Sequence, residues 1–297
     1  MSTFYRFSTA MAVVVLILFV LASCSKNKEV TPKVESITHN TSDDKISDEV
    51  KAQFVKLGYD VRDLTLIPED NPFTKDTGQQ NYLLQGDIVI TPQALQEMMA
   101  NVDHTGSEGK QNSRPNEEQY RTPNLVSGSP GRTIRVLGLN LDAKMQTGLT
   151  YTVANYNALY GSSFGLKFSL IFSSSPLAIS VSDIVVSQGL DQSGYPSGGN
   201  PYKWVKIMAG TGTLDELEHR MTHHIGHCLG LRHSDYFNTA LSCGGSPVNE
   251  GSAGVGAIYV PGTPVGYDPN SLMNKCHSAS TTGEFGAFDI TALKYLY

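Results

Sequence analysis

His223, His227 and His233 stand close together in the chain, with Gly230 between the last two. On a helix, side chains four residues apart lie on one face, so His223 and His227 can share a metal ion. Gly230 is placed to end that helix, because glycine adopts the left-handed conformation at no steric cost, and the reversed chain brings back His233. Three neutral imidazoles leave a fourth position open. The spacing therefore predicts a zinc site of the catalytic kind.

His224 follows the first of these histidines. In the H-E-x-x-H pattern of zinc peptidases that position holds a glutamate, which acts as the general base. An imidazole titrates near neutrality and can take a proton, but it lacks the negative charge of a carboxylate and can instead coordinate the metal. Replacing a positioned acid or base lowers a rate by about 10²- to 10⁴-fold. The sequence therefore predicts zinc binding more firmly than it predicts hydrolysis.

Other side chains are expected to support the site from loops. Asp235, two residues after His233, is predicted to orient that ligand or its turn as a hydrogen-bond acceptor, with a solvated aspartate as an equal alternative. Glu250 is a further carboxylate in a loop. Met273 lies in the segment 271–274 and is predicted to form a turn whose soft thioether packs beneath the ligand imidazoles.

The helix that positions the first two ligands is predicted from its own signals. Thr213 and Glu216 have the spacing of a capping box, and Gly230 supplies the stop. Apolar residues with a 3.6-residue period form a stripe that faces the core, which leaves the histidines directed toward a cleft. These residues are Leu214, Leu217, Met221, Ile225 and Cys228.

The remaining elements indicate an α/β (α+β) fold. Ser47 is expected to cap a short helix that Gly58 stops, and Thr91-Pro92 to begin another after a strand at 87–90. Beyond a polar stretch, β-branched and aromatic residues predict a twisted mixed sheet, backed by one helix and followed by the ligand helix. The predicted strands are 132–139, 166–172, 184–187 and 204–208, the backing helix is around 148–160, and a Gly/Pro-rich loop at 244–269 lines the cleft.

The N-terminus predicts export. Arg6 precedes an apolar run at 11–22 that is shorter than the roughly 20 residues needed to span a membrane and resembles the core of a signal peptide. The following Leu-Ala-Ser-Cys resembles a bacterial lipobox, so cleavage before Cys24 would make that residue the lipid anchor. The prediction is a lipoprotein of the bacterial cell envelope, with the outer membrane as first choice and either the periplasmic or the surface side; an ordinary signal peptide is the alternative.

Export also places the other cysteines in a compartment that permits disulfides. Cys243 and Cys276 flank the Gly/Pro-rich loop and are the first choice for a bridge, although three cysteines allow three pairings. Cys228 lies on the apolar stripe and is expected to be a buried thiol.

The run from His223 to Asp235 resembles the dual-action HEIGH metallopeptidases, a bacterial metzincin-like family, with the first glutamate of HEIGH replaced. The likeness covers roughly residues 80 to 297 and includes the segments 82–90, 119–122, 156–159 and 261–264. The resemblance implies a metzincin-like zincin fold and zinc-dependent hydrolysis of peptide bonds in protein or peptide substrates. Carried onto this sequence, it makes His223, His227 and His233 the zinc ligands, puts Met273 at the methionine turn and puts His224 at the general-base position.

Four segments are predicted: a signal peptide at 1–23, a flexible tether at 24–46, a small accessory or prosegment-like region at 47–127, and the zinc peptidase domain at 128–297. Three functions follow. The first is an exported, lipid-anchored zinc metallopeptidase of weak activity, and the alternative is a zinc-binding pseudoprotease that binds peptides. The third is a metal-free structural lipoprotein of the cell envelope. A net charge of −6 without a basic cluster argues against a nucleic-acid partner. Oligomeric state is not predicted.

Overall fold

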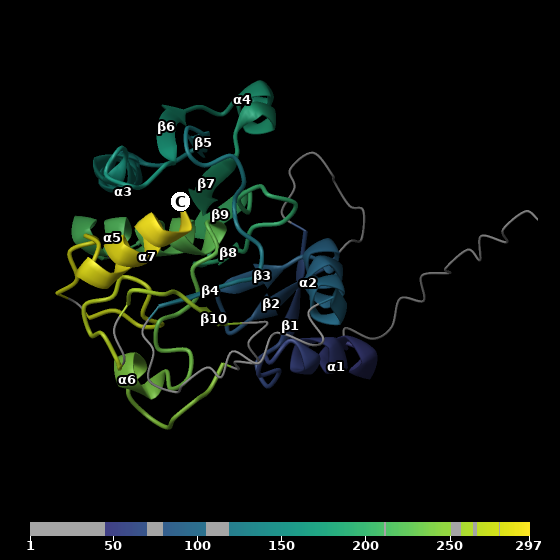
Figure 1. The fold of residues 1–297 in the computed structure, drawn as a ribbon. Helices are drawn as coiled ribbons and strands as arrows, with labels where there is room; N and C mark the ends of the chain where they lie inside the picture. The colour runs from purple at the N-terminus through teal and green to yellow at the C-terminus, as the bar shows by residue number, and fades with distance from the viewer. Residues whose placement is uncertain are drawn as a thin grey trace, which may run out of the picture. The chain divides into compact units, whose positions relative to one another are not determined.

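The structure is a computed structural model that describes residues 45–69, 80–104, 119–210, 212–250, 257–263, 266–278 and 280–297. These residues all belong to one compact unit, Asp44–Tyr297. The predicted signal peptide, Cys24 and nearly all of the tether lie outside them. Across the described ranges, no helix combines the length and the apolar character that a membrane crossing requires. The architecture is α/β, as predicted (Figure 1).

The larger sheet of the C-terminal part has four strands in the order β6-β5-β7-β9, and every neighbouring pair is parallel. The strands lie where the sequence predicts them, but the prediction of a mixed sheet is wrong for these four strands, because each crossover returns the chain in the same direction. Mixed pairing is found in the other four-stranded sheet. Their bounds are β5 (Thr133–Gly138), β6 (Lys167–Phe172), β7 (Ile184–Gln188) and β9 (Trp204–Ile207).

Helices cover both faces of this sheet. Helix α3 (Ala143–Leu159) connects β5 to β6 and packs with α5 (Leu214–Cys228) over one face, while the short α4 (Pro176–Val181) covers part of the other (Figure 1). Helix α3 starts earlier than predicted because Asp142 caps it, accepting a hydrogen bond of 2.8 Å from the amide of Met145. Gly148 lies where α3 packs on α5, and a methyl group there would be in ordinary contact with Cβ of Leu217 at 3.4 Å.

The N-terminal region has its own core and a second sheet, in the order β1-β2-β3-β8. Its pairs are antiparallel except for β3 with β8, which is parallel. Because β8 comes from the later part of the chain, the predicted boundary at residues 127 and 128 falls inside one compact unit. The elements are α1 (Asp48–Lys56), β1 (Thr65–Pro68), β2 (Gln80–Leu84), β3 (Ile88–Ile90), α2 (Pro92–His104) and β8 (Ser193–Gly194).

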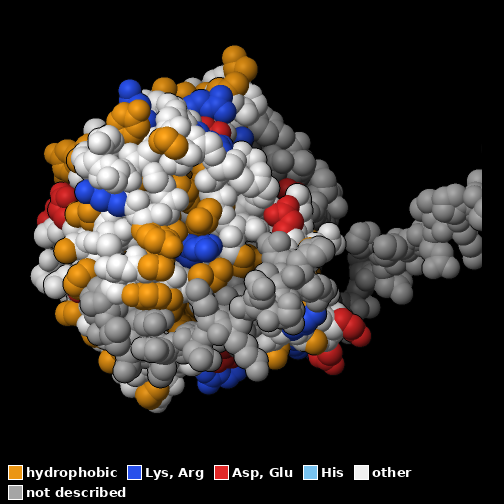
Figure 2. Space-filling view, viewed as in Figure 1, with side chains coloured by type: hydrophobic (Ala, Val, Ile, Leu, Met, Phe, Trp, Pro, Cys, Tyr) orange, Lys and Arg blue, Asp and Glu red, His pale blue; other side chains and the backbone are white. Residues whose placement is uncertain are grey.

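Short elements complete the fold around α5. Strands β4 (Tyr120–Arg121) and β10 (Ile258–Tyr259) form a two-stranded antiparallel sheet, so part of the predicted long loop is paired. Helix α6 (Ala240–Cys243) follows the ligand segment, and α7 (Ala287–Leu296) ends the chain. Figure 2 shows one face, on which separate groups of hydrophobic side chains alternate with polar surface and charged side chains are scattered.

Candidate metal centre

Helix α5 begins and ends as its sequence signals require. Thr213 and Glu216 form a complete capping box, with Oγ1 of Thr213 3.1 Å from the amide of Glu216 and Oε2 of Glu216 2.6 Å from the amide of Thr213. At the other end Gly230 has a φ of 100°, its amide donates to the carbonyl of His227, and the next amide donates to the carbonyl of Gly226. This Schellman motif turns the chain back toward the helix.

The turn brings the three predicted ligands together with a fourth residue. One donor atom each from Asp87, His223, His227 and His233 lies within 4.8 Å of the others. The Nε2 atoms of His223 and His227 are 2.9 Å apart, and Nε2 of His233 is 3.0 Å from Oδ2 of Asp87. In a tetrahedral zinc site with bonds of about 2.0–2.1 Å, neighbouring donors are about 3.3 Å apart. Small outward movements of the rings therefore make room for an ion.

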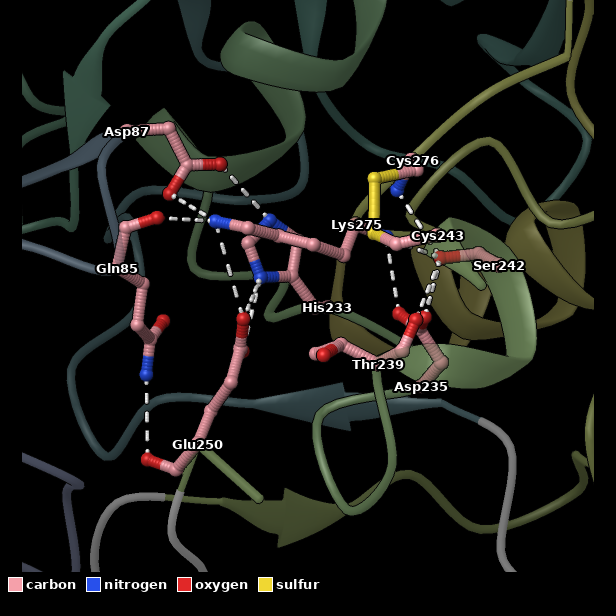
Figure 3. Close-up of a disulfide and its surroundings, with 10 residues drawn as sticks. All are labelled: Gln85, Asp87, His233, Asp235, Thr239, Ser242, Cys243, Glu250, Lys275 and Cys276. Carbon is pink, nitrogen blue, oxygen red and sulfur yellow. Dashed lines mark hydrogen bonds and ion pairs between the residues drawn. A yellow bond between two sulfur atoms is a disulfide. The ribbon is translucent and has the colours of Figure 1, made fainter. Parts of the chain in front are cut away.

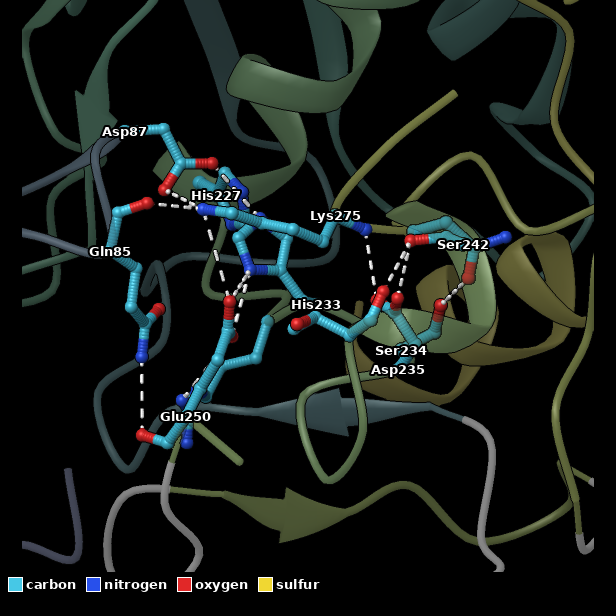
Figure 4. A network of polar contacts seen from close by, with 12 residues as sticks. Gln85, Asp87, His227, His233, Ser234, Asp235, Ser242, Glu250 and Lys275 are labelled. Atoms are coloured by element: carbon cyan, nitrogen blue, oxygen red, sulfur yellow. Dashed lines mark hydrogen bonds and ion pairs between the residues drawn. The ribbon is translucent and has the colours of Figure 1, made fainter. Parts of the chain in front are cut away.

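Each ligand imidazole is oriented through its other nitrogen. Nδ1 of His223 lies 2.9 Å from the carbonyl oxygen of Leu272, and Nδ1 of His227 lies 2.8 Å from that of Leu231. Nδ1 of His233 lies 2.9 Å from Oε2 of Glu250 (Figure 4). Acceptors at all three Nδ1 atoms favour a proton there, so that in each neutral ring the Nε2 lone pair is the one that can bind a cation.

Burial and charge set the protonation of the three rings. Burial, followed by the neighbouring imidazoles, lowers the pKa of His223 well below its usual value, and burial lowers that of His227 in the same way. Burial alone would also lower the pKa of His233, but the carboxylates of Glu250 and Asp87 outweigh it and raise the pKa to about 9. Nε2 of His233 is buried and faces Oδ2 of Asp87 at 3.0 Å. A cation at that atom, in place of the proton, suits both carboxylates.

Asp87 is the ligand candidate that the sequence did not reveal. It lies just before β3, and its Oδ1 is 2.9 Å from Nζ of Lys275, two residues after Met273 (Figure 3). Lys275 is also 3.8 Å from Oε1 of Glu250. Asp87 belongs to the predicted accessory region, and no periodic spacing links it to the histidines. Its one local signal is its place directly after Gly86 at the start of a strand.

Met273 lies beneath α5, where the sequence predicts it. Its side chain is buried, and a methyl group at Gly226 would come within 2.6 Å of its sulfur. Gly226 is in the helical turn between His223 and His227, so the thioether packs against the part of the helix that carries these two ligands. Ser234 ties the turn to the third ligand's segment, since its amide donates to the carbonyl of Met273 at 2.9 Å.

The profile of the dual-action HEIGH metallo-peptidase family matches residues 82–297. This chain belongs to that family. No curated protein matches it. Among solved structures, one titled "Structure of myroilysin" is similar with 13% identity and a TM-score of 0.37, covering 60% of this chain and 98% of its own. A second, "Crystal structure of myroilysin", has 14% identity and a TM-score of 0.32, and the match covers 61% of this chain and 98% of the myroilysin chain.

In this HEIGH metallopeptidase the five residues 223–227 read HHIGH, with His224 in second place. Its imidazole is buried, lies outside the group of four donors, and has Nδ1 2.9 Å from Oγ of Ser193. Burial lowers the pKa of His224 to about 4, so the ring is neutral at physiological pH. It lines a cleft of about 420 Å³ together with Asp87 and His223. His224 therefore borders the space beside the metal group without joining it.

Asp235 is buried and accepts hydrogen bonds from the loop, and not from the His233 ring, so the alternative of a solvated aspartate is wrong. Its Oδ1 accepts a hydrogen bond of 2.9 Å from the amide of Lys275, and its Oδ2 accepts one from Ser242 (Figure 3). Glu250 takes the place beside His233 instead. The reason is geometric: the chain turns after His233, so the carboxylate two residues on faces the loop and not the ring.

The structure joins Cys243 to Cys276, the pair that the sequence favours, and leaves Cys228 as a buried free thiol. The bridge lies next to Lys275 in the chain, and the amide of Cys276 donates to Oγ of Ser242 at 3.0 Å. The disulfide and the Asp235 carboxylate thus fix the segment from which Lys275 contacts Asp87.

Proposed function

We propose that this HEIGH metallopeptidase binds zinc through His223, His227 and His233 and hydrolyses peptide bonds in protein or peptide substrates. The observation that carries the proposal is the convergence of three Nε2 atoms, each with its Nδ1 held by an acceptor. Imidazole is a good ligand for zinc, and a site with three protein nitrogens and one further position is the form that catalytic zinc takes.

A bound zinc ion supplies an activated water and a positive charge that polarises a peptide carbonyl. The chain's own residues supply orientation. The carbonyl oxygens of Leu272 and Leu231 and the Glu250 carboxylate fix the three rings, and the cleft beside His223 offers room for a substrate segment. Lys275 places a positive charge at the edge of the same cleft.

A second candidate function is peptide binding without turnover. The observation that favours it is the state of His224, which is neutral, buried and hydrogen-bonded to Ser193. A neutral imidazole lacks the negative charge with which a carboxylate stabilises the proton that it accepts, and Nδ1 of His224 is already engaged with Ser193, so hydrolysis is expected to be slow. A zinc-binding pseudoprotease keeps the metal and the cleft and uses them to hold peptides.

The test is zinc content of the full-length chain, followed by exposure to a broad peptide library. We expect one zinc per natural chain, loss of that zinc in His227→Ala, and its retention in His277→Ala, a matched change of an exposed histidine in the same cleft. Cleavage by the natural chain or by Asp87→Ala that stops with chelator identifies the peptidase. Zinc and bound peptides without cleavage identify the pseudoprotease. Absence of zinc from the folded natural chain would overturn both.

We further propose that the chain is a lipoprotein of the bacterial cell envelope, anchored through Cys24. The support is the apolar run at 11–22 followed by the lipobox-like residues. A clickable fatty acid should label the natural chain and Cys228→Ala, and should not label Cys24→Ser, which should move to the soluble fraction. Equal labelling of Cys24→Ser would contradict the anchor.

A further inference from the structure

The carboxylate of Asp87 lies between the side chains of His233 and Lys275. Oδ2 is 3.0 Å from Nε2 of His233, and Oδ1 is 2.9 Å from Nζ of Lys275 (Figure 3). The side chains of Asp87 and Lys275 are only 15% and 19% exposed, so water screens the pair weakly. The carboxylate therefore faces the point on which the three ligand Nε2 atoms converge.

The backbone around Asp87 places its carboxylate next to His233. Gln85 and Gly86 both have positive φ, 60° and 83°, and form the turn between β2 and β3. A non-glycine residue in the left-handed region is uncommon and is held by its surroundings. The carbonyl oxygen of Gln85 accepts a hydrogen bond from Lys275, and its side-chain amide donates to the carbonyl of Glu250 at 3.1 Å. The turn is thus tied to the same residues that surround His233.

Strand pairing fixes the position further. β3 and β8 pair in parallel, and the amide of Ser193 donates to the carbonyl of Asp87 at 2.9 Å. The close approach needs Gly194, because a methyl group there would collide with the backbone oxygen of Val89. Ser193 in turn contacts His224 through its hydroxyl. The pair of β3 and β8 therefore connects the N-terminal region with two parts of the site. Asp87, just before β3, contacts His233, and Ser193, in β8, contacts His224.

A catalytic zinc needs an open fourth position for water and substrate. We propose that Asp87 is an inhibitory latch: its carboxylate takes that fourth position, Lys275 holds it there, and the hairpin of β2 and β3 must move before a substrate can reach the metal. The inference rests on the proposed zinc site and adds that the folded chain is latent. Residues 80–104, which include Asp87, then inhibit the metal site of their own chain.

The latch is tested by cobalt(II) substitution of the full-length chain and titration with acetohydroxamate, observed in the visible spectrum. If the open form is about 1% populated, its release raises apparent affinity about 100-fold. We expect little spectral change in the natural chain, a strong response in Asp87→Ala, and an intermediate response in Lys275→Met, which keeps the carboxylate but removes its partner. Asp191→Asn, a carboxylate change in the same cleft, should behave as the natural chain does.

The outcomes separate the two proposals. Failure of the natural chain to bind cobalt would remove the metal site itself. Cobalt binding with equal hydroxamate affinity in the natural chain and Asp87→Ala would leave the site and overturn the latch. Loss of cobalt from folded Asp87→Ala would also overturn it, because Asp87 would then be a permanent ligand of a closed site. Lys275→Met keeps the test decisive if Asp87→Ala does not fold.

Discussion

The three ligand imidazoles differ in what orients them. Backbone carbonyls hold His223 and His227, whereas a carboxylate, Glu250, holds His233. Figure 4 shows Glu250 and Asp87 on opposite sides of the His233 ring. A charged acceptor makes an imidazole more electron-rich and a better ligand than a neutral acceptor does. Glu250 should therefore contribute to metal affinity although it is not itself one of the four donors.

Glu250→Gln should weaken zinc binding by about 10- to 100-fold, because the neutral amide supports His233 less well. Competition with a coloured chelator measures the affinity. Asp235→Asn is the matched control and should leave zinc affinity unchanged, since Asp235 binds Ser242 and the Lys275 amide. An equal loss of affinity in both variants would show that the two carboxylates act together.

His224→Glu should restore a general base beside the metal. In chains that also carry Asp87→Ala, we expect peptide hydrolysis to rise about 10²- to 10⁴-fold over Asp87→Ala alone. His224→Gln has a similar size without a carboxylate and should give no increase. Initial rates on one quenched fluorescent peptide, compared at equal zinc content, measure the effect. Equal rates for the glutamate and glutamine variants would show that a carboxylate at position 224 does not act as a general base.

At the scale of elements, the loop after α6 owes its position to covalent and polar ties. The Cys243–Cys276 bridge closes a segment with a sequence separation of 33, and Asp235 accepts from both ends of the bridged region, at Ser242 and Lys275. Because the bridge restricts the unfolded chain, it stabilises the fold, and because it adjoins Lys275, it also steadies the contact with Asp87.

Reduction of the bridge should lower the free energy of unfolding by about 2–4 kcal/mol, the range for a loop of this length. Urea denaturation with and without reductant measures the change in the natural chain. The Cys243→Ser/Cys276→Ser chain should already show the loss and should not respond to reductant. A natural chain as stable in reductant as without it would contradict the stabilising role.

At the scale of the whole molecule, the metal group joins segments from opposite ends of the described chain. Asp87 comes from the N-terminal region, the histidines from α5 and its following turn, and Lys275 from the segment near the C-terminus. An ion bound by the four donors would hold Asp87 and the histidine segment together, and it would favour the folded chain over the unfolded one. Removal of the metal should therefore lower the free energy of unfolding of the whole domain.

Zinc at about 1,000 times its dissociation constant stabilises the folded state by about 4 kcal/mol. For a domain of this size each kcal/mol corresponds to about 2–4 °C. We expect chelator to lower the Tm of the natural chain by roughly 10 °C in differential scanning calorimetry, and to leave the Tm of His227→Ala unchanged. A chelator effect of the same size in His227→Ala would place the stabilising metal elsewhere.

Sequence alone determined those features that depend on near neighbours. The start of α5 at Thr213, its end at Gly230 and the common face of His223 and His227 follow from capping, from positive φ and from helical period, which act over a few residues. The positions of the four strands and of the backing helix follow from local patterns in the same way, whereas the parallel pairing of the strands does not, and the start of α3 is missed because the cap at Asp142 was overlooked.

Tertiary structure alone decided which distant groups meet the ligands. Asp87 and Glu250 approach His233 only because β3 pairs with β8 and because the chain beyond α6 folds back over the ligand segment. Asp235 is nearer to His233 in the sequence, but its carboxylate points away from the His233 ring because the chain turns between the two residues. Contacts between residues far apart depend on the whole path of the chain, and no local period or cap encodes them.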